Sequence, residues 1–235
     1  MSDPDRNLQD DLIEAPFNPI PRVVIALVAV ILGIEMLFSL GARGIIGGPD
    51  AIGWRLAAIQ DWAFADVVWE WMIENNRFPP AQMARFVTYP LIHVNFTHAL
   101  FVIVFMLAMG KLVSEVFGSL AFLVVFFGSA VAGALGYGVF LNPEQPLLGG
   151  YPGVYGLIGA FTFMMWMDLT KLGANRMRAF TLIGFLLGIQ LLFGLLFGGS
   201  LDWFADLIGF GTGFVLSFVV SPGGWTRLVD RLRRR

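Results

Sequence analysis

The 235-residue sequence contains no cysteine and only two histidines, His93 and His98. Without cysteine the chain can form no disulfide, no thiolate metal site and no cysteine nucleophile. Charged residues are also scarce, at 14% of the chain, and they sum to a formal net charge of −2. Nucleic-acid binding requires a clustered excess of positive charge, so we expect no nucleic-acid partner.

Apolar residues take the place of the missing charge. They make up 57% of the chain, and the mean hydropathy is +0.75. A soluble domain needs more polar surface than this composition supplies. The 23 phenylalanines suit contact with lipid, and the 28 glycines allow membrane helices to approach closely. The composition therefore predicts an integral membrane protein surrounded by lipid.

Six apolar stretches are long enough to cross about 30 Å of hydrocarbon. They lie near Val23–Leu40, His93–Met109, Leu120–Leu141, Gly153–Leu169, Phe180–Phe197 and Trp203–Val220. The sequence thus predicts an all-α protein with one membrane domain of six helices over residues 21–222. Residues 1–20 are acidic and polar, and they predict a mobile cytoplasmic tail without a cleaved signal peptide. Residues 223–235 form a basic cytoplasmic tail.

The basic residues predict the orientation of these helices. Most of them fall on one side of the six spans: Arg6, Arg22, Lys111, Lys171, Arg176, Arg178, Arg227, Arg231, Arg233, Arg234 and Arg235. Positively charged loops stay on the cytoplasmic side of a membrane. We therefore expect both termini in the cytoplasm, in what we predict to be a bacterial inner membrane.

The first outer loop, residues 43–92, is too long to be a plain connector. Its charged residues alternate with tryptophans, which prefer the membrane interface. Asp61–Ile73 therefore predicts one amphipathic helix lying along the outer surface. The alternative is a small folded loop with buried tryptophans. The tryptophans concerned are Trp54, Trp62, Trp69 and Trp71.

Three segments carry recognisable motifs. His93 and His98 are followed by Val102 in the pattern H-x4-H-x3-V; residues 149–156 read GGYPGVYG, and residues 205–213 read ADLIGFGTG. These segments resemble three landmarks of the rhomboid intramembrane serine proteases: H-x4-H-x3-N, a G-x-S-G nucleophile turn, and A-H-x-x-G-x-x-x-G. Arg85 resembles the arginine of the family's W-R loop motif, although Ala84 precedes it. The resemblance implies a six-helix fold with a large, partly embedded first loop.

The nucleophile turn can be aligned in two ways. Counted from the turn, Gly150–Gly153 overlays G-x-S-G, and Pro152 replaces the serine. Counted back from the helix, Tyr155 and Gly159 match a family aromatic and a glycine, and Tyr151 replaces the serine. We favour the second register because a helix fixes spacing and a turn does not. Neither register supplies an activated alcohol, since tyrosine would need a base to lower a pKa of about 10.

Two further positions depart from the family pattern. Asp206 stands where the resemblance implies the general-base histidine, with Gly209 and Gly213 in register behind it. Val102 replaces an asparagine that helps hold the oxyanion, and loss of one such donor costs about 10²–10³ in rate. Asp206 is either a functional acid, as polar residues inside membranes often are, or a cap at a wet helix mouth. We also expect Asp206 and His98 to act as one unit.

The two histidines make a poor metal site. If both begin one helix, a separation of five residues turns their imidazoles about 140° apart. We therefore expect no metal and no cofactor. The glycines of the last span have a structural role instead, since Gly209 and Gly213 lie one turn apart and predict close packing against Gly156 and Ala160.

The predicted function is that of a rhomboid pseudoprotease without catalytic residues. Such a protein binds transmembrane segments of client proteins and affects their assembly, transport or turnover. One alternative is a structural subunit or assembly factor of a membrane complex. Another is a residual intramembrane peptidase whose site is displaced to Ser129 or Ser200, although neither serine lies in a nucleophile turn.

Overall fold

The computed structural model describes residues 19–141, 143–197 and 201–224 of the chain. These residues form helices and no strand, which confirms the all-α prediction for the described part. The longer helices are α2 (Arg22–Ala42), α7 (Phe96–Phe117), α8 (Ser119–Leu141), α9 (Tyr151–Lys171), α10 (Thr181–Phe197) and α11 (Asp202–Val220). Most of the two predicted tails lies outside the described residues.

Each predicted span overlaps one of these six helices, although the span predicted over His93–Met109 begins before α7 and ends eight residues before it does. Four of them, α2, α7, α8 and α11, are long and apolar enough to cross a membrane, judged by length and composition over the described residues. The other two fall short of that measure for visible reasons. Helix α9 begins with the glycine-rich sequence YPGVYG, and α10 has 17 residues.

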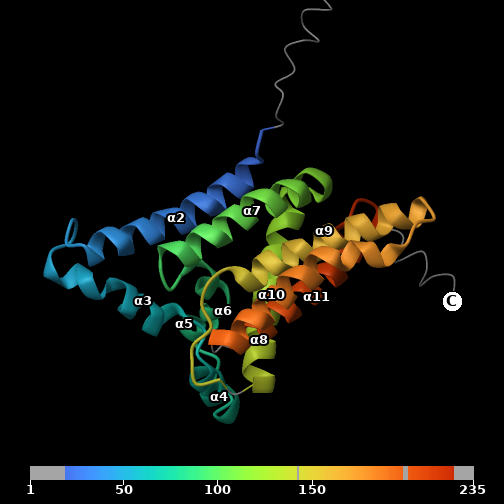
Figure 1. The fold of residues 1–235 in the computed structure, drawn as a ribbon. Coiled ribbons are helices and arrows are strands. Elements are labelled where there is room, and N and C mark those ends of the chain that lie inside the picture. Colours follow the sequence, from blue (N-terminus) through green and yellow to red (C-terminus); the bar gives the residue numbers. More distant parts are fainter. Residues whose placement is uncertain (1–18, 142, 198–200, 225–235) are drawn as a thin grey trace, which may run out of the picture.

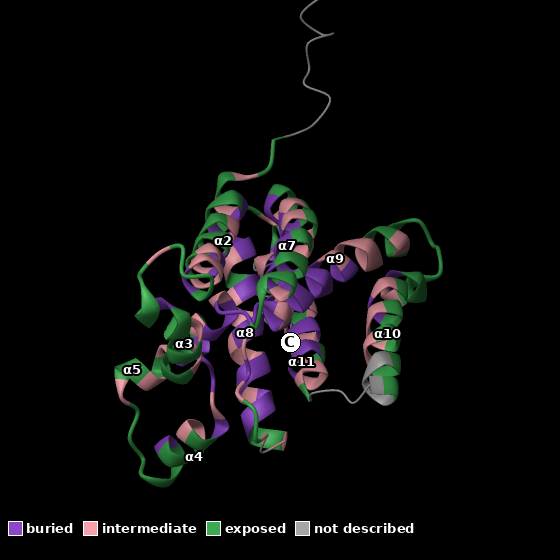
Figure 2. Ribbon diagram, turned by 60° about the vertical axis from the view of Figure 1, so that its left-hand side comes forward, coloured by how far each residue is buried: buried purple, intermediate pink, exposed green. Residues whose placement is uncertain are grey.

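Helix α9 lies at the centre of the molecule. It packs against α11, α8 and α7, and its residues from Pro152 to Ala160 are all buried. Helices α2 and α7 lie side by side as a second pair, and α7 packs against both α9 and α8 (Figure 1). Buried positions gather on α8 and on the first half of α9, whereas α10 is largely exposed (Figure 2). The molecule therefore has a central helix enclosed by three neighbours and one peripheral helix, α10.

The last span does approach α9 closely, but its two glycines meet Pro152 and Gly156, one turn earlier than the predicted Gly156 and Ala160. A Cβ atom added at Gly209 would overlap the carbonyl of Pro152, and one added at Gly213 would overlap the carbonyl of Gly156. Gly156 in turn faces the side chain of Ser129 on α8. The glycines therefore let α9 and α11 meet backbone to backbone and leave room for the Ser129 side chain of α8, which fixes the start of α9 against α11.

The first loop folds differently from the prediction. It contains α3 (Trp54–Trp62), α4 (Asp66–Glu74), α5 (Pro80–Met83) and α6 (Arg85–Thr88), with 3₁₀ turns at Pro49–Gly53 and Tyr89–Leu91. The single helix predicted over Asp61–Ile73 is wrong, because the chain is extended between α3 and α4. There the backbone of Phe64 exchanges two hydrogen bonds with Leu147, at 3.1 and 2.8 Å.

A packing contact between residues that are distant in the sequence accounts for this break in the helix. The ring of Phe64 is buried against Phe86, at a centroid distance of 5.0 Å, and this packing needs the backbone to leave the helix. The tryptophans of the loop are not buried as a group, since Trp54, Trp62 and Trp71 are all exposed. The folded-loop alternative with buried tryptophans therefore does not hold for these three.

Candidate functional site

A cavity of about 210 Å³ opens where α7, α9, α10 and α11 meet the segment before α9. It is the place where the motif residues of the second, fourth and last predicted membrane helices come together. Its lining residues are His98, Leu147, Leu148, Tyr151, Pro152, Gln190, Asp202 and Asp206.

The glycine pair before α9 packs against two motif residues of α7 beside this site. Gly149 has φ +91°, a conformation that side chains other than glycine rarely adopt, and a Cβ there would lie 2.5 Å from Cε1 of His98. A Cβ at Gly150 would lie 2.9 Å from Cγ1 of Val102. The turn therefore rests directly on His98 and Val102, so the motif residues of α7 and α9 are in contact.

The two histidines do not share a helix, contrary to the prediction. Helix α7 begins at Phe96, and Asn95 caps it by accepting a 2.9 Å hydrogen bond from the His98 amide. His93 lies in the irregular segment before this cap. Its ring therefore contacts that of His98 edge to face, with 5.2 Å between centroids, instead of pointing away. The expectation that the two imidazoles diverge, which rested on their lying on one helix, is therefore wrong.

His93 holds the glycine turn in place. The Gly150 amide donates a 3.3 Å hydrogen bond to its Nε2. Burial lowers the pKa of His93 to about 3, so the imidazole is neutral and can accept this bond at physiological pH. His93 is thus a positioning residue for the start of α9.

His98 faces Tyr151 through its ring. The two rings stack with 5.0 Å between centroids and an interplanar angle of 23°. The Nδ1 atom of His98 accepts a 3.4 Å hydrogen bond from the Val94 amide. Tyr151 also contacts Tyr155 edge to face at 6.4 Å. The imidazole therefore packs on the tyrosine ring and makes no hydrogen bond with its hydroxyl in the described structure.

Asp206 is held by a residue that sequence reasoning missed. Its side chain is 2% exposed, and Oδ2 accepts a 2.8 Å hydrogen bond from Nε2 of Gln190 on α10. The Oε1 atom of Gln190 accepts a 3.1 Å hydrogen bond from the Tyr155 hydroxyl. Among the described residues no hydrogen bond joins Asp206 to His98, so the predicted His98–Asp206 unit is replaced by a Tyr155–Gln190–Asp206 chain. A signal was present, since Gln190 lies within an otherwise apolar stretch.

The comparisons with known proteins agree with this geometry. Residues 80–223 match the rhomboid domain, which is more than half of the chain. The chain belongs to the rhomboid family. YdcA of Bacillus subtilis, by its name a candidate rhomboid protease, is 25% identical over 203 residues, which cover 86% of this chain and 88% of YdcA.

Two relatives from Toxoplasma gondii match a shorter stretch. Rhomboid-like protease 3 is 29% identical over 149 residues, and rhomboid-like protease 1 is 27% identical over 148 residues. These matches cover 62% and 61% of this rhomboid, and 56% and 50% of the two relatives. All three relatives carry the name of a protease.

Arg85, the rhomboid-like loop arginine, lies away from the cavity. It is 8% exposed, and it donates to the carbonyl of Ala63 at 2.8 Å and to Oε1 of Gln82 at 2.6 Å. These bonds tie α6 to the extended link between α3 and α4. In this rhomboid Arg85 therefore shapes the first loop and does not touch the cavity.

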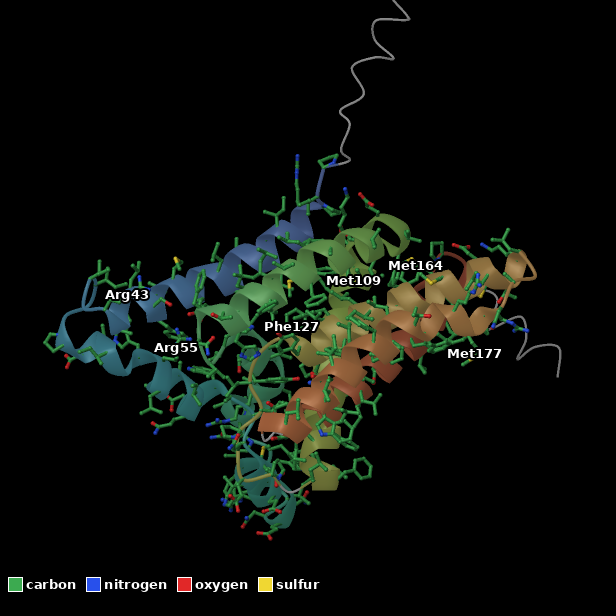
Figure 3. The ribbon with its side chains drawn as sticks, viewed as in Figure 1. Arg43, Arg55, Met109, Phe127, Met164 and Met177 are labelled. Carbon is green, nitrogen blue, oxygen red and sulfur yellow. The ribbon has the colours of Figure 1, made fainter. Side chains whose placement is uncertain are left out.

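A second buried acid also supports the site, and the sequence analysis overlooked it inside the first predicted span. Glu35 of α2 is 1% exposed and accepts two hydrogen bonds from Arg55 of α3, at 2.6 and 2.8 Å. Arg55 lies between these two helices and also donates to the backbone carbonyl of His93 at 2.6 Å (Figure 3). The network thus connects the first loop, through His93, to the glycine turn of the rhomboid site.

Proposed function

We propose that this rhomboid is a pseudoprotease that binds transmembrane segments of client proteins and affects their assembly, transport or turnover without cleaving them. The observation that carries the proposal is the set of residues that line the cavity. Tyr151 and Pro152 stand at the start of α9, and Asp206 faces them from α11. His98 is stacked on Tyr151.

Peptide hydrolysis by acyl transfer needs an activated alcohol, a base within hydrogen-bond reach and donors for the oxyanion. We assign Tyr151 to the nucleophile position, because it lies on His98, and Pro152 to the residue that closes the turn. Asp206 is engaged by Gln190, and Val102 has no hydrogen to donate. The nucleophile and the base therefore lack a suitable residue, and the oxyanion lacks one of its donors.

A second candidate is a residual peptidase, which the names of the three relatives favour. Its proposed displaced nucleophile Ser129 is fully buried between α8 and Gly156 of α9, so water and substrate cannot reach it. Ser200 lies outside the described residues. Labelling by a fluorophosphonate probe would separate this candidate from the pseudoprotease, for which we expect no labelling.

The membrane arrangement belongs to the same proposal. All six long helices cross the bilayer, both termini lie in the cytoplasm, and the membrane is a bacterial inner membrane. The alternating direction of the six helices and the basic residues at one end support this topology. The first loop and the cavity then face the outer side, where a client helix enters from the lipid.

Photo-crosslinking tests client binding directly. A crosslinking residue at Leu148, which lines the cavity, should capture membrane proteins in cells. The control position is Phe101 of α7, which is 53% exposed and should capture mainly lipid. Capture of the same proteins from both positions would overturn the proposal. A stoichiometric partner that stays bound through purification would instead indicate a structural subunit of a membrane complex.

A further inference from the structure

The cavity is acidic, and His98 is the one histidine among its described lining residues. Asp202 and Asp206 both line it, one helical turn apart at the start of α11, about 6 Å along the axis. None of the described lining residues is a lysine or an arginine. Arg55, the basic residue of the nearby network, is already paired with Glu35.

Asp206 presents an oxygen that has no partner. Gln190 satisfies Oδ2, whereas Oδ1 is buried and makes no hydrogen bond with any described residue. A buried carboxylate oxygen without a partner is costly, and a cation that donates to it removes that cost. The unpartnered atom thus points to a ligand that carries both a positive charge and hydrogen-bond donors.

The size and the chemistry of the site narrow the ligand further. A cavity of about 210 Å³ is smaller than the roughly 300–1,000 Å³ of sites for drug-sized molecules. Among the described residues no group of His, Asp and Glu side chains is arranged to hold a metal ion. A single extended side chain ending in an ammonium or a guanidinium group is small enough for this volume, and it supplies the positive charge without a metal ion.

We propose that this cavity receives the lysine or arginine side chain of a client transmembrane segment, with Asp206 as the primary acceptor and Asp202 as the outer one. The inference rests on the proposed client-binding function and adds the chemistry that selects the client. A basic residue is expensive in lipid, so a helix that carries one gains by placing it against a buried carboxylate. The selected residue lies within the first turns of the client helix on the side of the first loop.

The test measures binding of synthetic transmembrane peptides to the full-length protein in lipid nanodiscs. One peptide of leucine and alanine carries a single lysine one turn inside its outer end, and the matched peptide carries glutamine there. We expect the lysine peptide to bind about tenfold more tightly, as a charge-assisted hydrogen bond in a dry site gives. Asp206→Asn, which keeps the shape and the bond to Gln190, should remove this preference, and Asp202→Asn should reduce it.

Asp168→Asn is the matched control, because Asp168 is an exposed acid paired with Lys171 at the far end of α9. It should leave the preference unchanged. Equal binding of the two peptides to the unmodified protein, or a preference that survives Asp206→Asn, would overturn the inference and leave client binding standing. Failure of every peptide to bind would overturn both the inference and the proposed function.

Discussion

At the scale of single residues, Gln190 holds the buried carboxyl group of Asp206 by donating a hydrogen bond to its Oδ2 atom. Gln190→Leu removes the hydrogen bond to Oδ2 and leaves a buried acid with no donor, which should lower stability in detergent by about 1–3 kcal/mol. The same loss is expected from Asp206→Ala, and the double variant should be no worse than the poorer single variant. Thermal unfolding of the four proteins measures this cycle.

His98 provides the contrast for that cycle. It packs on Tyr151 and shares no hydrogen bond with Asp206 among the described residues. The losses from His98→Ala and Asp206→Ala should therefore add. The opposite result would be that the losses from Gln190→Leu and Asp206→Ala add, whereas those from His98→Ala and Asp206→Ala do not. It would show that Asp206 is coupled to His98 and not to Gln190.

His93 should make stability depend on pH. Its pKa is about 3 in the folded protein because of burial, against about 6.5 in the unfolded chain. Below pH 6.5 the unfolded chain therefore takes up a proton that the folded protein does not. The contribution of His93 to the free energy of unfolding is fully present above pH 6.5. Below that pH it decreases by about 1.4 kcal/mol per pH unit as the pH falls toward 3.

The measurement compares the unmodified protein with His93→Gln at pH 7.5 and pH 5. Glutamine can still accept from the Gly150 amide but cannot take up a proton. We expect the unmodified protein to lose about 2 kcal/mol more stability than the variant over this interval. Parallel losses in the two proteins would show that His93 does not titrate as its burial requires.

At the scale of elements, the pair of Glu35 and Arg55 attaches α3 to α2. Glu35 is buried, so Arg55→Ala leaves its carboxylate without a counterion and with only the Ser39 hydroxyl as donor, which should cost about 3 kcal/mol. The double variant Glu35→Met and Arg55→Met removes both charges and should be more stable than Arg55→Ala. Chemical denaturation measures both differences.

The exposed pair of Lys171 and Asp168 serves as the control for this prediction. Both side chains are more than two-thirds exposed, so Lys171→Ala should cost at most about 1 kcal/mol. Similar losses from Lys171→Ala and Arg55→Ala would mean that the first loop is not held by the buried pair.

The contact of α9 with α11 should be intolerant of one added carbon. Gly213→Ala places Cβ on the carbonyl of Gly156, and neither backbone can move without separating the two helices. We expect a loss of at least 3 kcal/mol or a failure to fold. Gly211→Ala lies on the same helix with no atom within 4 Å of the new Cβ, and it should be neutral or slightly stabilising. The yield and melting temperature of the two variants provide the comparison.

At the scale of the whole molecule, the sequence predicts the long helices well because long apolar runs and glycine spacing are local signals. It fails where distant residues decide the backbone. Phe64 leaves its helix to pair with the distant Leu147. The start of α7 after His93 is set by a local signal instead, the cap at Asn95, which the predicted span did not use.

The residues of the candidate site can be predicted from the sequence only where a local motif identifies them. Of the motif residues, Tyr151 and Asp206 line one cavity, and Val102 lies beside Gly150 in the turn before α9. The motifs do not reveal Gln190 or Arg55, since each reaches its acid from a different helix, and no sequence period records such a pairing.

We propose that this rhomboid holds transmembrane segments and does not cut them. The most direct measurement is intact mass spectrometry of a substrate of a catalytically active rhomboid, incubated with this protein in nanodiscs. We expect only the uncut mass after prolonged incubation. The same result is expected with Tyr151→Ser and Asp206→His combined, because Val102 and Pro152 still leave the oxyanion donors and the turn incomplete. A cleavage product from the unmodified protein that disappears on a single substitution at Tyr151, His98 or Asp206 would contradict the proposal.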